Sequence, residues 1–172
     1  MPLVGGGLLI VALLVGALAV WRWASAPAAC ANANVRSHRF GYCLTAPNGW
    51  SEADPTSGQL SADEFFRLDA SATLTIQAVA SAGDLDTFSA TLRGVQQKEG
   101  SRTGATRATE VDGVKAVEWD ATLAIGSGAI LDRTIVFERG GFAWRVEFAD
   151  TADDFDSHVA DLGRILRSWH FT

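Results

Sequence analysis

Residues 106–125 read TRATEVDGVKAVEWDATLAI, and this stretch decides the fold. The dipeptide Asp112-Gly113 stands between two segments of small, β-branched and alternating residues, 106–111 and 114–125. An Asp-Gly pair is typical of a two-residue β-hairpin, because the turn needs left-handed backbone conformations that these residues tolerate. The stretch therefore predicts two antiparallel strands joined by a tight turn.

Strand patterns continue on both sides of this hairpin. Phe142, Trp144 and Val146 alternate with other residues, so they are expected to share one face of a strand that begins after Gly140-Gly141. Upstream, Pro47-Asn48-Gly49 predicts a turn after the first strand of the domain. The further predicted strands are 40–44, 65–68, 72–80, 129–138 and 142–148.

Two segments have helical periodicity instead. Asp84 is a suitable N-cap for a helix that Gly100 ends, with apolar residues at Leu85, Phe88, Leu92 and Val95. A second helix is predicted over 152–168, with an apolar stripe formed by Phe155, Val159, Leu162, Ile165, Leu166 and Trp169. Antiparallel strands with one inserted and one terminal helix predict an α+β fold, an antiparallel sheet packed with helices.

The charge balance argues against nucleic acid as a partner. The chain has 172 residues with 14 basic and 20 acidic side chains, a net charge of −6. Every acidic residue lies at Glu52 or beyond. Nucleic-acid phosphates would be repelled by such a domain rather than neutralised.

The first 23 residues predict a membrane anchor. Leu3 to Trp21 contains no charged residue, and as a helix it would span about 28 Å, close to the thickness of a bilayer's hydrocarbon core. Trp21, Arg22 and Trp23 are residue types found at the membrane interface. Ala12 and Gly16 form a small-x-x-x-small pair suited to packing against another helix. The alternative is a cleaved signal peptide, for which 24–26 (ASA) and 26–28 (APA) are suitable cleavage patterns.

The domain organisation follows from this anchor: anchor at 1–23, linker at 24–38 and α+β domain at 39–172. The two cysteines, Cys30 and Cys43, predict a disulfide and hence an extracytoplasmic domain, because disulfides persist in oxidising compartments. The alternatives are unpaired thiols and a lipid-modified Cys30. The arginines that follow the anchor oppose this orientation, since positive charge favours the cytoplasmic side.

A resemblance to a known family rests on three short motifs. The first strand runs into 46–50 (APNGW), the Asp-Gly hairpin leads to a strand that contains Ala116, and the chain closes on 165–171 (ILRSWHF). Over residues 39–172 this order is similar to the PsbP-like family, named for an extrinsic protein of photosystem II. The resemblance implies an α/β/α sandwich that docks onto another protein, as in bacterial lipoproteins and a nuclear Ran-binding protein. The predicted anchor departs from photosynthetic members.

No residue pattern predicts a catalytic, cofactor or metal site. His38, His158 and His170 lack metal-ligand spacing, and His158 is expected to be solvated. The acidic group Asp150, Asp153, Asp154 and Asp156 fits the start of a helix better than a calcium loop. No Gly-x-Ser-x-Gly nucleophile motif occurs.

The tryptophans are the remaining candidates for a partner contact. Trp119, between Glu118 and Asp120, is predicted to be exposed on a strand. Trp50 is the second candidate, although its place in the opening turn also suits packing. The leading hypothesis is a membrane-anchored, non-enzymatic protein-binding module, an accessory subunit or assembly factor of a membrane protein complex. The alternatives are an extracytoplasmic carrier of a small ligand or lipid, and a hydrolase whose site has no recognisable motif.

Overall fold

The computed structural model describes residues 30–53, 62–69, 71–80 and 83–172. The described residues form two helices, α2 (Leu85–Lys98) and α3 (Phe155–Arg167), and eleven strands. The strands are β1 (Val35–Ser37), β2 (Tyr42–Leu44), β3 (Trp50–Glu52), β4 (Ala62–Arg67), β5 (Thr73–Ala80), β6 (Arg102–Thr103), β7 (Arg107–Val111), β8 (Val114–Ile125), β9 (Gly128–Arg139), β10 (Phe142–Thr151) and β11 (His170–Phe171).

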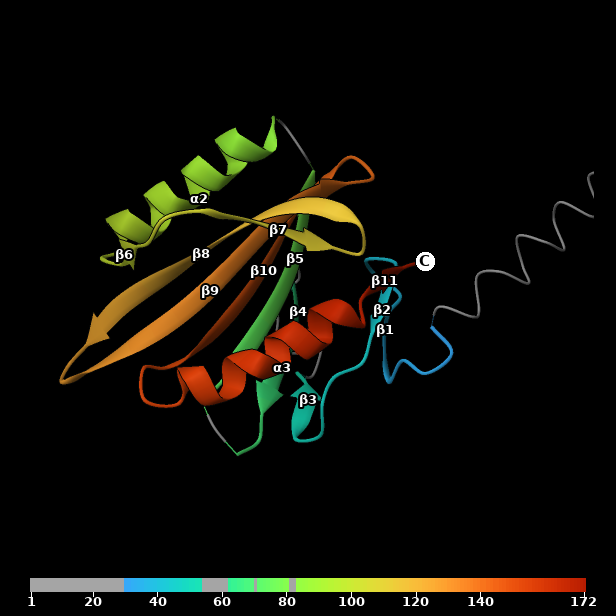
Figure 1. Ribbon diagram of the computed structural model, residues 1–172, viewed down its shortest axis with the longest axis horizontal. Helices are drawn as coiled ribbons and strands as arrows, with labels where there is room; N and C mark the ends of the chain where they lie inside the picture. Colours follow the sequence, from blue (N-terminus) through green and yellow to red (C-terminus); the bar gives the residue numbers. More distant parts are fainter. Residues whose placement is uncertain (1–29, 54–61, 70, 81–82) are drawn as a thin grey trace, which may run out of the picture.

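Eight strands form one antiparallel sheet, and its centre is the run of hairpins predicted from the sequence. The order is β3-β4-β5-β10-β9-β8-β6, and β7 pairs with β8 on the same edge as β6. The hairpin turn lies at Asp112 and Gly113, whose φ angles of 47° and 76° are those a two-residue turn of this type requires. Figure 1 shows the long strands β8, β9 and β10 side by side, with α2 and α3 well apart.

The helix α3 closes one face of this sheet and buries most of the apolar core. Phe155, Leu162 and Ile165 are at most 3% exposed, because the apolar stripe of the helix lies on the sheet. The sheet contributes alternate residues of adjacent strands to this core, namely Phe65, Leu74, Ile76, Ile135, Phe137, Trp144, Val146 and Phe148. A buried carboxylate fixes the helix, since Asp161 accepts hydrogen bonds from Trp50, Arg67 and Arg164.

The helix α2 closes the opposite face with fewer apolar side chains. Gln96 is 6% exposed and its amide contacts Trp119, Thr134 and Asp132 from the sheet. These three residues alternate with the α3-side residues along β8 and β9, so the two helices lie on opposite faces of the sheet. The α+β prediction is confirmed, and Asp84 caps α2 as expected by accepting from the backbone N–H of Thr87.

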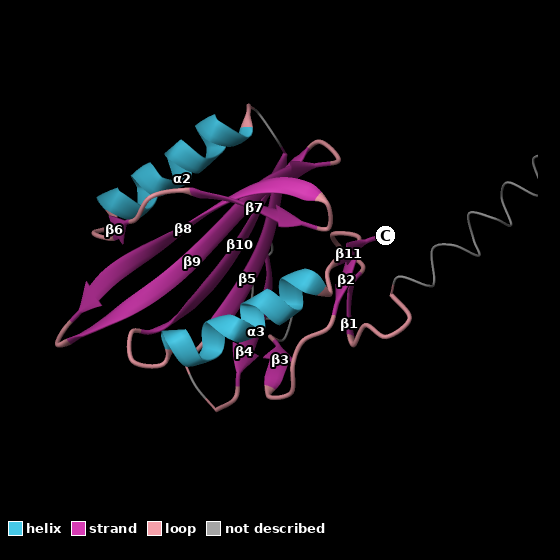
Figure 2. Cartoon of the chain, viewed as in Figure 1, coloured by secondary structure: helices cyan, strands magenta, loops and turns pink. Residues whose placement is uncertain are grey.

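A second, three-stranded sheet stands at one end of the molecule, in the order β1-β2-β11. It joins the beginning of the described chain to its C-terminus, and α3 ends beside it (Figure 2). The predicted linker is wrong here: Val35–Ser37 pairs with β2, and the buried Cys30 is bonded to Cys43. The folded domain therefore begins at least nine residues before the predicted boundary at residue 39.

Two predicted boundaries differ from the structure near the C-terminus. The strand predicted over 142–148 continues to Thr151, because its partner β9 pairs with it as far as Ile130. The last helix therefore starts at Phe155 rather than at residue 152. Neither helix of the described residues is long and apolar enough to cross a bilayer.

Candidate functional site

A groove runs between α3 and the β7–β8 hairpin. Two cavities of about 260 Å³ and about 200 Å³ lie along it, and both are lined by Glu110, Leu166 and Arg167. Because the cavities share these three residues, they form one elongated depression. We call it the α3 groove.

The floor of the α3 groove is apolar and is built by the C-terminal half of the helix. Val159, Leu162 and Leu166 line it from α3, and Ile135 lines it from the sheet. Gly163 also lines the groove, and the absence of a side chain there leaves space beside Arg167. The stripe that packs the core therefore continues partly uncovered into the groove.

One end of the α3 groove is bounded by a ladder of ion pairs. Arg107 pairs with Glu118 and with Asp120, each at 3.0 Å, and Arg133 pairs with Asp120 at 2.7 Å. Burial disfavours the ionised Asp120 carboxylate, but its bonds to Arg133 and Arg107 outweigh burial and lower its pKa. These charges compensate one another, so this end is polar without a strong net field.

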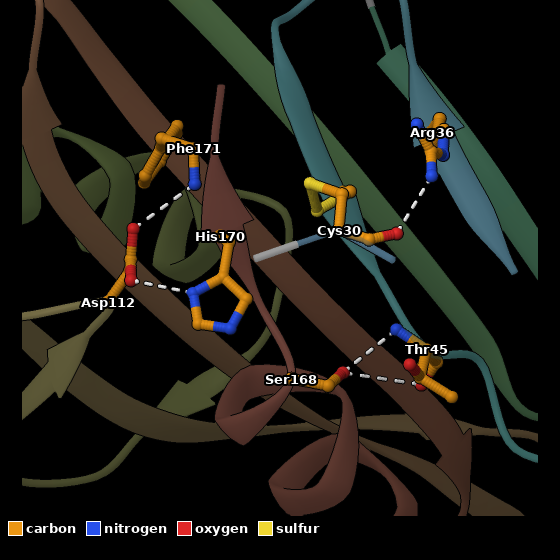
Figure 3. The surroundings of a disulfide bond; sticks show 8 residues. Cys30, Arg36, Thr45, Asp112, Ser168, His170 and Phe171 are labelled. Carbon is orange, nitrogen blue, oxygen red and sulfur yellow. Dashed lines mark hydrogen bonds and ion pairs between the residues drawn. A yellow bond between two sulfur atoms is a disulfide. The ribbon is translucent and has the colours of Figure 1, made fainter. Parts of the chain in front are cut away.

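The other end is closed by the hairpin turn and the C-terminal strand. Asp112 accepts a hydrogen bond from the backbone N–H of Phe171 at 3.1 Å and contacts Nδ1 of His170 at 3.1 Å. Arg139 pairs with the same carboxylate at 3.3 Å. Figure 3 shows Asp112 facing His170 and Phe171, with the disulfide nearby. The turn that the sequence identifies is thus fixed to the end of the chain.

Between these ends, two charged side chains are not neutralised by the described residues. Glu110 and Arg167 stand at the junction of the two cavities, both are exposed, and neither forms an ion pair with another described residue. Their opposite signs suit a ligand with polar groups of both kinds, such as a peptide backbone. The α3 groove was not predicted, because its residues come from distant strands and one helix.

The two cysteines named from the sequence are bonded in the structure. The Cα atoms of Cys30 and Cys43 lie 5.9 Å apart, and both residues are buried. Arg36 donates a hydrogen bond to the carbonyl of Cys30 at 2.8 Å, which fixes the chain there (Figure 3). The bond joins the start of the described chain to the central strand of the small sheet.

The prediction for Trp119 is wrong. Its side chain is 0% exposed, because it points towards α2 and its indole N–H donates to Gln96 at 2.7 Å. Its charged neighbours Glu118 and Asp120 lie on the other face, where they join the ion-pair ladder. Trp50 is partly buried against Phe148, and its N–H donates to Asp161 at 3.0 Å.

His158 and Asp150, from the histidines and the acidic group considered above, are paired with each other. His158 is not solvated as expected: its Nδ1 lies 2.6 Å from the buried carboxylate of Asp150. Asp150 also accepts from Ser71 at 2.9 Å, so the serine hydroxyl contacts the acid rather than the histidine. Because the serine hydroxyl is bonded to the acid and not to the histidine, these three residues do not form a nucleophile activated by a base. No group of three potential metal ligands occurs among the described residues.

The predicted membrane residues lie outside the described part of the chain. These are the interface residues Trp21, Arg22 and Trp23 and the helix-packing pair Ala12 and Gly16. Their roles therefore stay predictions.

Comparison with known proteins identifies the fold. No family model matches the sequence, and no curated protein matches it. Cyanobacterial PsbP from Synechocystis is similar in structure, with a TM-score of 0.61 and 17% identity over 80% of this chain and 91% of that one. LpqN of Mycobacterium tuberculosis, described as involved in cell envelope biogenesis, has a TM-score of 0.59 and 12% identity over 80% of this chain and 88% of that one. The yeast Ran-binding protein Mog1p has a TM-score of 0.55 and 8% identity over 80% of this chain and 93% of that one. The domain has the PsbP-like fold.

Proposed function

We propose that this protein is a membrane-anchored, non-enzymatic binding module, an accessory subunit or assembly factor of a membrane protein complex. The observation that carries the proposal is the α3 groove, which combines an apolar floor with charged walls. The same fold serves in Mog1p, a Ran-binding protein.

The shape of the α3 groove favours a segment of a protein over a compact small molecule. Sites for small ligands commonly enclose about 300–1,000 Å³. The space of the α3 groove is instead divided into two cavities of about 260 Å³ and about 200 Å³ that meet at Glu110, Leu166 and Arg167, so it is elongated rather than one compact chamber. An extended segment would place apolar side chains against Val159 and Leu166 and its polar backbone groups beside Glu110 and Arg167.

The location follows from the N-terminal sequence and the disulfide. Residues 3–21 are apolar and of bilayer length, and Trp21, Arg22 and Trp23 suit the interface that follows. The Cys30–Cys43 bond favours an oxidising compartment, because cytosolic thiols are kept reduced. The domain would then lie on the extracytoplasmic side, next to the membrane complex that it serves.

The test is isolation of the full-length protein in mild detergent together with a variant that fills the α3 groove. Gly163→Leu introduces a bulky side chain where the groove is open, and the only close neighbour of its Cβ is the flexible end of Arg167. Leucine is a better helix former than glycine, so the variant is expected to fold. We expect a stoichiometric membrane partner with the native chain and at least about a tenfold loss with the variant, the loss for 1.4 kcal/mol of binding energy.

A matched control is available in the other helix. Gly94→Leu makes the same replacement in α2, where nothing lies within 4 Å of the added Cβ. This control should retain the partner. Recovery of the native protein alone contradicts the proposal, and a co-purifying small molecule in native mass spectrometry would favour the carrier instead.

A further inference from the structure

Two arginines stack on aromatic rings at the end of the domain where the described chain begins. The guanidinium of Arg39 lies 4.9 Å from the ring centre of Phe40, and that of Arg139 lies 4.0 Å from the ring of Phe171. Both rings pack edge-on against Trp144, at 6.0 Å and 5.1 Å between centroids. Arg39, Phe40, Arg139 and Phe171 thus lie together over the buried Trp144, and we call these four residues the basic end.

The charge of the basic end is opposite to that of the rest of the domain. Arg36, Arg39 and Lys115 are exposed, and no acidic residue precedes Glu52 in the sequence. Asp112 at this end is already paired with Arg139 and His170, and Lys115 has Glu110 as its cross-strand neighbour. In contrast, the chain as a whole has a net charge of −6. The described residues before Glu52, which include Arg36 and Arg39, therefore carry basic side chains and no acidic ones.

The basic end is also the end at which the described chain begins, at Cys30. Cys30 is held by the disulfide beside β1 and β2, and Figure 1 shows these strands at the same end as the C-terminus. The six residues 24–29 separate Trp23 from Cys30 and can span at most about 21 Å. A bilayer that holds the N-terminal segment would therefore lie close to Arg36 and Arg39.

From these observations we propose that the basic end docks the domain on the anionic lipid headgroups of the membrane. This inference rests on the proposed anchor. Arginine and lysine at an anionic surface are attracted within about a Debye length, whereas the acidic remainder of the domain is repelled. Phe142, which is 47% exposed at the adjoining β9–β10 turn, supplies an apolar contact at the same end. The arginines that follow the anchor then have a role at the membrane surface that does not depend on cytoplasmic orientation.

The experiment places the full-length chain in lipid nanodiscs and measures hydrogen–deuterium exchange in residues 36–41 and 139–142. Discs of phosphatidylcholine alone are compared with discs that contain phosphatidylglycerol. The test variant is Arg39→Glu combined with Lys115→Glu, two exposed positions without hydrogen bonds to other described residues. The control is Lys98→Glu, equally exposed at the end of α2 and beside β6 in Figure 1, far from β11.

We expect exchange at the basic end to be slower by roughly fivefold in anionic discs, the contribution of about one basic side chain at such a surface. The double variant should lose this protection, high salt should remove it, and Lys98→Glu should retain it. Equal exchange in both kinds of disc, or protection that survives the double variant, overturns the proposal. A chain that does not insert contradicts the anchor instead, and anionic vesicles then provide the same comparison for the basic end.

Discussion

Each face of the eight-stranded sheet is covered by one helix, but the side chains between sheet and helix differ in polarity. Beneath α3 the contacts are aromatic and aliphatic, with Phe148, Phe155 and Leu162 all at most 3% exposed. Beneath α2 the closest contacts form a polar network around Gln96. Burial of apolar area is the main favourable term in folding, so the α3 face is expected to carry most of the stability.

The polar α2 face is specified by hydrogen bonds rather than by volume. The amide of Gln96 accepts from Trp119 and donates to Thr134 and Asp132, so both of its polar atoms are satisfied. Burial raises the pKa of Asp132 and lowers the pKa of Arg145 on this face, because both lose contact with water. Around Gln96, the buried polar groups are therefore matched with one another, although the buried Nε of Arg145 on the same face has no hydrogen-bond partner among the described residues.

The comparison can be tested most strongly with matched valines. Val146 and Val136 are both 0% exposed, but Val146 belongs to the α3 core and Val136 faces α2. Val146→Ala should lower the free energy of unfolding by about 2–3 kcal/mol, since a rigid aromatic shell cannot collapse into the cavity. Val136→Ala should cost about 1–2 kcal/mol. The free energies of unfolding of both variants can be measured in urea. Equal decreases for the two variants would contradict the proposed difference between the faces.

A second test exchanges the buried tryptophans for phenylalanine. Trp119 donates its indole N–H to Gln96, whereas the buried N–H of Trp169 has no hydrogen-bond partner among the described residues. Trp119→Phe leaves the oxygen of Gln96 unpaired and should cost about 1–3 kcal/mol for that reason. Trp169→Phe has no such penalty and should lose only packing. Thermal unfolding that ranks the two in the opposite order would contradict the proposed role of the network.

The smallest expected effect is a pH dependence of opposite sign on the two faces. The folded pKa of Asp120 is lowered, so its stabilisation is present above its ordinary pKa and is lost as pH falls. The folded pKa of Asp132 is raised, so its cost is absent in acid, grows as pH rises above the ordinary pKa and is complete above the raised value. At neutral pH, Asp120→Asn should therefore destabilise and Asp132→Asn should stabilise, each by less than about 1 kcal/mol.

The Asp132 difference should disappear below the ordinary Asp pKa of about 3.9, whereas the Asp120 difference should begin to fall there and disappear only below its lowered folded pKa. Unfolding measured from pH 3 to pH 8 provides the test. A stability difference of the same sign for both variants would show that the two carboxylates do not differ as described.

The hairpins and helices could be predicted because their signals are local. Asp112-Gly113 fixes its turn by backbone conformation, and the apolar stripe of α3 follows from helical spacing. The strand β1 could not be found in this way, because Val35–Ser37 is held by pairing with β2 and by the nearby disulfide. Such long-range constraints leave no periodic pattern in three residues.

The candidate site was largely invisible for a related reason. The charged neighbours Glu118 and Asp120 suggested that Trp119 is exposed. Successive side chains of a strand point to opposite faces, however, so these two residues indicate the environment of the face that Trp119 does not occupy. The α3 groove depends on where α3 stops covering β8 and β9, and no spacing within one segment contains that information. The cysteine pair was the exception, since two cysteines thirteen positions apart permit one pairing.

The disulfide also determines how the domain bears mechanical load. A pull on the chain before Cys30 would otherwise peel β1 from β2 one hydrogen bond at a time. With Cys30 bonded to Cys43, the force enters β2 through covalent bonds, and β2 is the middle strand of its sheet. From there it passes through β11 directly into the end of α3. A force applied to the chain before Cys30 would thus be spread over the core, and reduction of the disulfide would let β1 separate from β2.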